Sequence, residues 1–476
     1  MTVGVYRSRN PTLSSTEKNQ VSIPSISNGI DSNEKKEIID EHSQHEEDGI
    51  FQNGIFIRHR GLNWFVTGLF VVGELAGGGL VAIPTAMVQL GIYVGLPLAL
   101  VMNVIFMITG FMLGVAWNVL LRRWPQYRSH CRKPYPEIAY RALGPVCRLI
   151  VTIFCRLIVT ICIDVTQFGI AVVYLLLSAK NIHDALKSFV DTNFSFCYVI
   201  LILAACLTPV LFLKSPQDFW WAVVFAMFTT SAAVILILTG ALMDNSECHK
   251  EINFPKFKLT NIFLGMGTLL FAYGGHSAFP TIQHDMKMPH QFTRSSTLAF
   301  IILFIMYTPV GIIGYYTYGD SLHDSVINSI QTQGIQQAIN LLITVHCILT
   351  LTIVFSPLNQ DMEEIFKVPQ KFGPRRVIVR TGMMVAVVFA AESVPTFGPL
   401  LDLMGGSTLT LTSVVFPALF YIFLTAGEKK AEHMAQIRGY STEEDEEPPT
   451  FKEMLKYSDK KVVLLVALII VFGVCG

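Results

Sequence analysis

Two stretches of the chain share one pattern: GGLVAIP at residues 78–84 and GGHSAFP at residues 274–280. Each lies inside a hydrophobic run of the length that crosses a bilayer. Glycine lowers the cost of leaving helical geometry and proline removes a backbone donor, so each stretch predicts an interrupted helix. Bare backbone groups inside a membrane persist only where they line a cavity. We therefore expect both interruptions to face an internal site.

The rest of the sequence has the composition of a polytopic membrane protein. It has 476 residues, of which 52% are hydrophobic and only 15% are charged, whereas soluble proteins carry about 25% charged residues. Its hydrophobic runs predict an all-α protein with about eleven transmembrane helices. The expected spans are residues 63–90, 92–117, 150–178, 196–213, 219–243, 260–282, 296–318, 336–357, 376–397, 399–425 and 462–476.

The same composition argues against several other classes of protein. The chain carries 35 Lys and Arg against 35 Asp and Glu, so it lacks the excess positive charge of a nucleic-acid-binding protein. Its nine cysteines form no C-x-x-C pair and no Cys/His spacing typical of a metal site. The sequence also has no P-loop and no cluster of catalytic groups. We therefore expect neither an enzyme nor a resident metal or cofactor.

The two glycine stretches fall five spans apart, in the first and sixth expected helices. An odd offset means that they cross the membrane in opposite directions, which is typical of an inverted repeat. The half-helix that starts near Leu80 presents free N–H groups that suit a carboxylate. The half-helix that ends near Tyr273 presents carbonyl groups that suit an ammonium group. A small zwitterion satisfies both ends. The alternative is that the glycines only allow close helix packing, and the second related copy makes it less favoured.

The same residues resemble a known family. FAYGGHSAFPTIQ at residues 271–283, with Met288-Pro289 after it, closely resembles the sixth helix of the amino acid/auxin permease (AAAP) family. GGGLVAIP at residues 77–84 resembles that family's G-T-G-x-L-x-x-P helix, with Gly78 where Thr is common. The family ranges over proton-coupled and sodium-coupled amino acid transporters, the vesicular GABA carrier and plant permeases. The resemblance covers about residues 58–476.

This resemblance implies a LeuT-like five-plus-five inverted repeat, in which helices one and six are broken, and symport of amino acids. By the motif match, the first glycine cluster contacts the substrate carboxylate, and the end of the preceding half of helix six contacts its amino group and side chain. The expected substrate-binding residues are Gly77, Gly78, Gly79, Leu80, Phe271, Ala272, Tyr273 and Gly274.

Three ionisable residues within the spans are candidates for ion coupling. Glu74 lies one turn before the first glycine cluster, where it could carry a proton or form a salt bridge to a neighbouring helix. Asp164 lies in the third span, and a partner elsewhere is expected for it. His276 lies inside the second interruption, where it could titrate or only donate hydrogen bonds to unwound backbone. Because Gly78 replaces the common Thr, protons are favoured over sodium, which stays the alternative. Weaker candidates are His346, Glu392 and Asp402.

Lys and Arg gather in alternate connections between the spans, which places the N-terminus in the cytosol. Residues 1–57 are expected to be a disordered cytosolic tail, and residues 58–476 the transmembrane domain. A cytosolic loop at 427–461 is expected before a short last helix. A sequence similar to an acidic di-leucine signal at residues 34–39 keeps an endolysosomal or vesicular membrane open beside the plasma membrane.

Two smaller features fall in connections that are expected on the external side. Asn193 begins the only N-x-[ST] sequon and is a possible glycosylation site. Cys197 and Cys248 lie near the external ends of their spans and could form a disulfide, although two free thiols agree equally well with the sequence.

The expected function is secondary active transport of small neutral amino acids by ion symport, with alternating access around the two interrupted helices. The alternatives are a vesicular or lysosomal amino acid or GABA-like carrier, a sodium-coupled symporter, and a transport-like sensor that binds an amino acid without moving it. The expected partners are the amino acid and the lipid bilayer. The sequence specifies neither the amino acid nor the oligomeric state.

Overall fold

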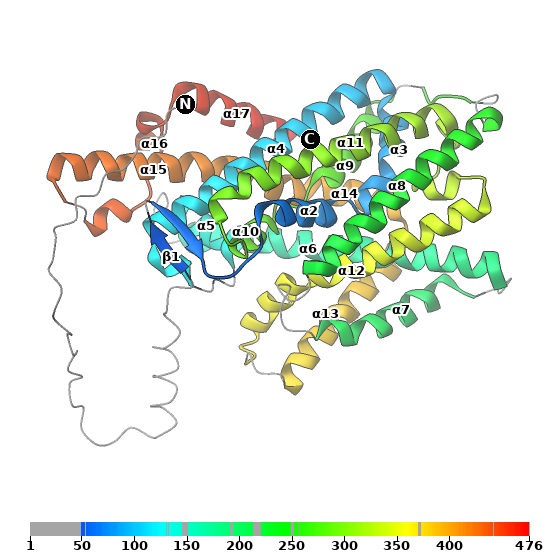
Figure 1. Ribbon diagram of the computed structural model, residues 1–476, viewed down its shortest axis with the longest axis horizontal. Helices are drawn as coiled ribbons and strands as arrows, with labels where there is room; N and C mark the ends of the chain where they lie inside the picture. Colours follow the sequence, from blue (N-terminus) through cyan, green and yellow to red (C-terminus); the bar gives the residue numbers. More distant parts are fainter. Residues whose placement is uncertain are drawn as a thin grey trace.

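The computed structural model describes residues 49–52, 54–129, 131, 133–144, 151–190, 194–212, 220–248, 252–256, 258–369, 373–440 and 442–475. Most of these residues are helical, and the long helices run side by side, roughly along the long axis of the molecule (Figure 1). Their buried hydrophobic side chains form one continuous core. The chain is therefore a helical protein of the membrane type, as its composition predicts.

Six helical segments of the described chain are long and apolar enough to cross a membrane, or seven if the bent pair α2 and α3 counts as one span. Five lie in α4 (Ile92–Arg123), α6 (Val151–Val190), α8 (Trp220–Cys248), α11 (Phe292–Tyr318) and α12 (Gln333–Ile365). The sixth joins α14 (Phe397–Met404), the π-helical turns η7 (Gly405–Leu409) and η8 (Leu411–Val415), and α15 (Phe416–Arg438). The count of eleven spans stays a prediction.

The remaining helices are shorter, and two of them, α7 (Phe196–Leu211) and α9 (Leu259–Tyr273), are apolar. Helix α13 (Pro374–Ser393) packs on α6 and α7, and α5 (Pro134–Leu143) packs on α6 and α15. The short elements are η1 (Pro125–Arg128), α10 (Phe279–His284), η4 (Pro289–Gln291), η5 (Gly319–Ser321), η6 (Val326–Ser329), η9 (Glu443–Glu446), α16 (Phe451–Tyr457) and α17 (Lys460–Cys475).

The chain leaves helical geometry at the first glycine stretch. Helix α2 (Trp64–Leu75) starts at the cap Asn63, whose side chain accepts from the Val66 N–H at 2.8 Å, and α3 (Gly78–Leu90) follows it at an angle of 58°. Between them Gly77 adopts φ −104° and ψ −120°, far from helical values. Pro84 stays inside α3, so the glycines and not the proline mark the break.

The chain leaves helical geometry a second time at the second stretch. Helix α9 ends at Tyr273, and the short α10 begins only at Phe279. A Cβ atom on Gly274 would lie 1.7 Å from the Leu409 side chain and 2.9 Å from the Leu270 carbonyl oxygen, so a larger residue there requires Leu409 to move. Pro280 lies in the first turn of α10, where its missing N–H costs no helical hydrogen bond. The glycines therefore serve close packing as well as the break.

Part of the expected disordered tail is ordered. Strands β1 (Gly49–Gln52) and β2 (Ile55–Arg58) form an antiparallel hairpin. The Arg128 guanidinium lies 3.9 Å from the centre of the Phe51 ring, and the Arg58 N–H donates to the Lys287 carbonyl at 2.9 Å. These contacts tie the hairpin to the helical body, and the boundary at residue 57 stays a prediction. The rest of that tail, residues 1–48, lies outside the described residues.

The expected loop at 427–461 is largely helical. Helix α15 continues to Arg438 because residues 428–438, EKKAEHMAQIR, are good helix formers. Gly439, with φ 84°, ends it in the left-handed conformation that glycine adopts most easily. A capping box of Thr450 and Glu453 then starts α16.

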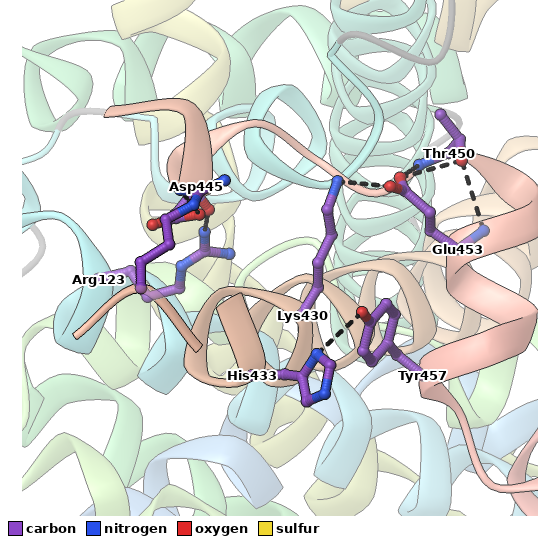
Figure 2. Close-up of polar contacts among 8 residues, drawn as sticks. Arg123, Lys430, His433, Asp445, Thr450, Glu453 and Tyr457 are labelled. Carbon is purple, nitrogen blue, oxygen red and sulfur yellow. Dashed lines mark hydrogen bonds and ion pairs between the residues drawn. The ribbon is translucent and has the colours of Figure 1, made fainter. Parts of the chain in front are cut away.

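Polar contacts hold this C-terminal region against α4 and α15, as Figure 2 shows. The Lys430 ammonium lies 2.8 Å from a Glu453 carboxylate oxygen, and the Arg123 guanidinium donates to the Asp445 carbonyl at 2.5 Å. The final helix, α17, is only 16 residues long and packs on η8 and α15.

Candidate functional site

The two interruptions meet in the core of the molecule, although almost two hundred residues separate them. Helices α3 and α9 pack together, and a Cβ on Gly79 would lie only 2.4 Å from the Ala272 Cα. The buried Tyr307 of α11 bridges them, because its hydroxyl lies 3.0 Å from the Leu75 carbonyl oxygen and 3.2 Å from the Ala272 carbonyl oxygen. The ends of α2 and α9 are thus joined through one side chain.

The first interruption offers backbone donors. Gly78 and Gly79 are the first two residues of α3, so their N–H groups have no partner within that helix. The Leu80 N–H, by contrast, donates to the Gly77 carbonyl at 3.2 Å. The donors without an intrahelical partner therefore begin at Gly78, and the role of Leu80 in substrate binding stays a prediction.

The second interruption offers backbone acceptors at the end of α9. The Phe271 carbonyl accepts from the Gly274 N–H at 3.2 Å, and the Ala272 carbonyl accepts from Tyr307. The Tyr273 carbonyl, as the last of the helix, lacks an intrahelical donor. The Tyr273 ring is buried between the rings of Phe106 and Tyr307. Donors and acceptors thus come together where Gly79 meets Ala272.

A cavity of about 470 Å³ lies near the two interruptions, within the range of small-molecule sites. None of the eight expected substrate-binding residues is among the described residues that line it. Glu74, Gln167 and Ala278 line its buried end, and the exposed Arg60 and Gly61 line the other. The cavity therefore opens toward the end of the molecule that carries the β-hairpin. The full lining is Arg58, Arg60, Gly61, Leu62, Phe70, Glu74, Gln167, Ala278, Thr281, Ile282, Asp285, Ile353 and Pro357.

Glu74 is the expected coupling residue that lines the cavity. Its side chain is 7% exposed, and its Oε2 atom has no hydrogen-bond partner among the described residues. Across the cavity Gln167 of α6 donates to the Ser277 hydroxyl of the second interruption at 3.0 Å. A carboxyl group without a partner, next to the first interruption, is open to a proton or to a ligand.

Asp164 belongs to a different cluster. Its carboxyl faces the Asp361 carboxyl of α12, and the Lys133 ammonium lies 2.9 Å from Asp361 and 3.1 Å from Glu364. Burial lowers the pKa of Lys133, but the two neighbouring carboxylates outweigh it, so this pKa is raised and the lysine stays charged. The partner expected for Asp164 is therefore present, in a cluster that does not include the interruptions.

His276 lies within the second interruption but turns toward α4. Its Nε2 lies 2.9 Å from the Phe106 carbonyl oxygen and 3.1 Å from the Thr109 hydroxyl, and its ring stacks on Phe279. It is not among the described residues that line the cavity. Of the two roles considered for it, the geometry favours hydrogen bonding that holds unwound chain.

Two residues of the site have no signal in the sequence. Tyr307 and Tyr174 are buried tyrosines on α11 and α6, and the Tyr174 hydroxyl donates to the Glu74 carbonyl at 3.2 Å. His346, a weaker candidate by sequence, lies with them, since a Cβ on Gly77 would be 2.7 Å from the Tyr174 hydroxyl and 2.8 Å from the His346 Nε2. To predict that these three side chains meet at the first interruption, one needs to know which face each helix turns toward it. Hydrophobic runs in the sequence do not define that face.

The outlying candidates lie away from the cavity lining. Asp402 accepts from the Thr268 hydroxyl at 2.5 Å, and Glu392 interacts with the Cys197 thiol. Cys197 and Cys248 are both free, so the possible disulfide is not formed. Asn193 lies outside the described residues.

The family model described as transmembrane amino acid transporter protein matches residues 60–438. Among curated proteins, the chain is 24% identical to "Amino acid transporter AVT1I" of Arabidopsis thaliana over 379 residues, covering 77% of this chain and 88% of that protein. It is 23% identical to "Lysine histidine transporter-like 4" of the same plant, covering 77% and 81%. These relatives are transporters and not enzymes, in agreement with the motifs.

The fold is also similar to a solved structure. "Inward facing conformation of Mhp1" superposes with a TM-score of 0.52 over 90% of this chain and 92% of that chain, at 11% sequence identity. At this identity the likeness concerns the fold alone. It supports the LeuT-like arrangement that the two motifs imply.

Proposed function

We propose that this chain, which belongs to the transmembrane amino acid transporter family, carries out proton-coupled symport of small neutral amino acids. As a member of that family it is an integral, multi-pass membrane protein. The substrate binds as a zwitterion beside the contact of Gly79 with Ala272. The N–H groups of Gly78 and Gly79, at the positive end of the α3 dipole, hold its carboxylate. The carbonyl groups at the end of α9 hold its ammonium group.

The contact between the two interruptions carries this proposal. Glycine at position 79 lets the start of α3 approach the backbone of α9, which brings donors and acceptors to one place. Tyr307 then fixes the distance between the ends of α2 and α9. In a low-dielectric interior each charged end of a zwitterion needs such a partner, since an unpaired buried charge costs several kcal/mol.

We further propose that α2 with α3, and α9 with α10, are the broken helices one and six of an eleven-helix, five-plus-five inverted repeat. With the N-terminus in the cytosol, the cavity from Glu74 to Arg60 opens to the cytosol, so this conformation faces inward. Alternating access then requires this opening to close and the other side of the site, where Phe271 and Tyr273 lie, to open. The membrane is the plasma membrane or that of an endolysosomal or vesicular compartment.

Uptake into proteoliposomes tests the function. The purified chain is reconstituted and given twenty labelled amino acids and GABA under an inward proton gradient, an inward sodium gradient, or neither. We expect uptake of small neutral amino acids that follows the proton gradient. Sodium-driven uptake would overturn proton coupling, and binding without any flux would overturn transport in favour of a sensor.

Two glycine variants make the test specific for the site. Gly79→Ala places a methyl group against the Ala272 backbone, and we expect it to lower uptake about 100-fold. Gly382→Ala, on α13, is the matched control because its Cβ would meet nothing within 4 Å. Equal uptake by both variants would contradict the proposed binding place.

A further inference from the structure

His346 of α12 has an unused bonding position at the first interruption. The side chain is fully buried, and its Nε2 has no hydrogen-bond partner within the described part of the chain. This atom faces the backbone at Gly77, directly before the free N–H groups of Gly78 and Gly79. An unpaired buried polar atom destabilises the fold. Such an atom calls for an explanation, and a ligand or proton that completes it is one.

The other ring nitrogen determines which form of the imidazole is present. The His346 Nδ1 lies 2.7 Å from the Thr230 hydroxyl and 3.2 Å from the Ala226 carbonyl oxygen. The Thr230 hydroxyl also bonds to the Ala226 carbonyl, at 3.1 Å. A carbonyl only accepts, so these contacts are all satisfied when Nδ1 carries the proton. Nε2 then carries a lone pair, which faces the first interruption.

The titratable groups around His346 come from three other helices. Tyr174 of α6 presents the edge of its ring at 6.3 Å between centroids, and it also interacts with Glu74 of α2 and Tyr307 of α11. Helix α8 contributes Thr230 and Ala226, which do not titrate. A positive charge on His346 would therefore lie beside Gly77, the residue before a carboxylate bound at Gly78, and would share the neighbouring Tyr174 with Glu74.

We propose that His346 couples the proton to the substrate: its Nε2 takes one proton from water as the carboxylate binds at Gly78 and Gly79, and returns it when the carboxylate leaves. This inference rests on the proposed transport function. A lone pair repels a bound carboxylate, whereas an N–H⁺ attracts it, and the attraction is strong in a low-dielectric interior. By linkage, the bound carboxylate then favours the proton to the same degree.

The identity of the coupling residue distinguishes this mechanism from the ones based on Glu74 and His276. His276 bonds through its Nε2 to the Phe106 carbonyl, and its Nδ1 has no hydrogen-bond partner in the described part of the chain. Its ring, however, packs among Phe106, Phe279 and Phe300, whereas the His346 Nε2 lies at the backbone of Gly77. Glu74 could carry the proton as well, because an ionised Glu74 would repel a bound carboxylate and the neutral form would not; the Glu74→Gln variant below separates the two. His346 is the group whose charge opposes that of the substrate carboxylate, so proton and substrate stabilise each other.

Calorimetry measures the coupling directly. The purified full chain is titrated with L-alanine, or with the amino acid of the panel that is taken up fastest, at pH 7.5 in buffers of different ionisation enthalpy. The dependence of the heat on the buffer gives the protons bound per substrate. We expect about one proton for the wild type and about none for His346→Gln. His276→Gln is the matched control and should remain at one.

The result that would overturn the proposal is one proton per substrate in His346→Gln, or none in the wild type. Loss of proton uptake in Glu74→Gln, with His346→Gln unchanged, would assign the coupling to Glu74. Should His346→Gln not fold, Thr230→Val keeps the imidazole and removes its Nδ1 partner. We expect that variant to retain proton uptake at a shifted pH midpoint, and an unshifted midpoint contradicts the proposal.

The same measurement keeps this inference separate from the transport function. A wild type that binds alanine with one proton but shows no flux would overturn transport and leave the role of His346 intact. If the wild type transports alanine and His346→Gln still takes up a proton, the role of His346 is overturned and the transport function is kept.

Discussion

The two interruptions have the same glycine pattern but different surroundings. At the second, His276 stands inside the motif and bonds to the Phe106 carbonyl of α4, between the aromatic rings of Phe106 and Phe279. At the first, the histidine comes from another helix, and its Nε2 has no partner in the described chain. His276 also has one ring nitrogen, Nδ1, without a hydrogen-bond partner among the described residues, but its ring packs against Phe106, Phe279 and Phe300 and not against the backbone at Gly77. The two breaks thus differ in where the unbonded nitrogen lies.

The difference shows that the two interruptions have different roles. The second interruption uses its side chains to hold unwound backbone in place. The first interruption leaves backbone donors open and gathers the polar groups of three neighbouring helices around them, namely Tyr174, Tyr307 and His346. We infer that substrate recognition involves both breaks, whereas proton coupling belongs to the first alone.

The largest effect is expected where the two breaks touch. Gly79→Ala forces a methyl group to 2.4 Å from the Ala272 Cα. A backbone atom cannot relieve this clash by a change of rotamer, as a side chain can. We expect alanine uptake to fall about 100-fold, equivalent to about 3 kcal/mol, the upper end of ordinary overpacking. Gly274→Ala meets the Leu409 side chain instead, which can move, so we expect about a 10-fold loss.

A double variant sharpens this difference. Leu409→Ala removes the atom that a Cβ at position 274 would meet, so it should restore most of the uptake of Gly274→Ala. Leu409→Ala should not restore Gly79→Ala. Rescue of both variants, or of neither, would show that the two glycines do not differ as described.

The two histidines give the next comparison. We expect His346→Gln to lose proton-driven accumulation of alanine at least 10-fold while still exchanging labelled for unlabelled alanine across the membrane. We expect His276→Gln to keep coupling but to melt at a lower temperature, because the Phe106 carbonyl loses its donor. Uptake driven by a proton gradient, exchange without a gradient, and thermal unfolding separate the two outcomes. If His276→Gln lost coupling while His346→Gln kept it, the roles assigned to the two histidines would be contradicted.

A smaller effect is expected from the tyrosine that joins the breaks. Tyr307→Phe removes the donor shared by the Leu75 and Ala272 carbonyls. Loss of one such bond costs about 0.5–1.5 kcal/mol, so alanine should bind about 3- to 10-fold more weakly. Tyr318→Phe is the matched control, since that hydroxyl donates to Asp244. Equal binding constants for the two variants would remove Tyr307 from the site.

The smallest effect is expected far from both breaks, at the contact of α16 with α15. The Lys430 ammonium is the main cause that lowers the pKa of Glu453. The pair therefore stabilises the fold above the ordinary carboxyl pKa of about 4.3, and this contribution is lost as the pH falls through the lowered value. For a pair near the surface it amounts to about 0–1 kcal/mol.

Glu453→Gln should therefore lower the melting temperature slightly at pH 7 and not at pH 3, with uptake at pH 7 unchanged. A loss of uptake comparable to that of Gly79→Ala would mean that the C-terminal region takes part in transport.

The sequence located both interruptions and the family, because Gly and Pro act on the backbone wherever they stand and need no knowledge of neighbours. The side chains of the site depend on neighbours. His276 was a coupling candidate because it lies in the motif, yet its ring turns toward α4. Tyr307 and His346 were missed or ranked low because their helices are apolar on most sides, so periodicity does not define the face that meets the breaks.

Two segments outside the membrane helices differ from expectation for a related reason. The hairpin at 49–58 is held by contacts to Arg128 and Lys287, which are far away in the sequence. The helical part of 427–461 could have been recognised from its residues, since 428–438 are good helix formers and Gly439 follows them. Its charge alone made it resemble a loop.

The central claim is that the two breaks together bind both charged ends of an amino acid, and competition binding tests it most directly. Labelled L-alanine on the purified chain is displaced by unlabelled alanine, by alaninamide, which lacks the carboxylate, and by propionate, which lacks the amino group. We predict that each analogue competes about 10- to 100-fold more weakly than alanine, the value of one charge-assisted hydrogen bond of 1.5–3 kcal/mol. We also predict that Gly79→Ala binds none of the three. An analogue that competes as well as alanine, or unchanged binding in Gly79→Ala, would contradict the account.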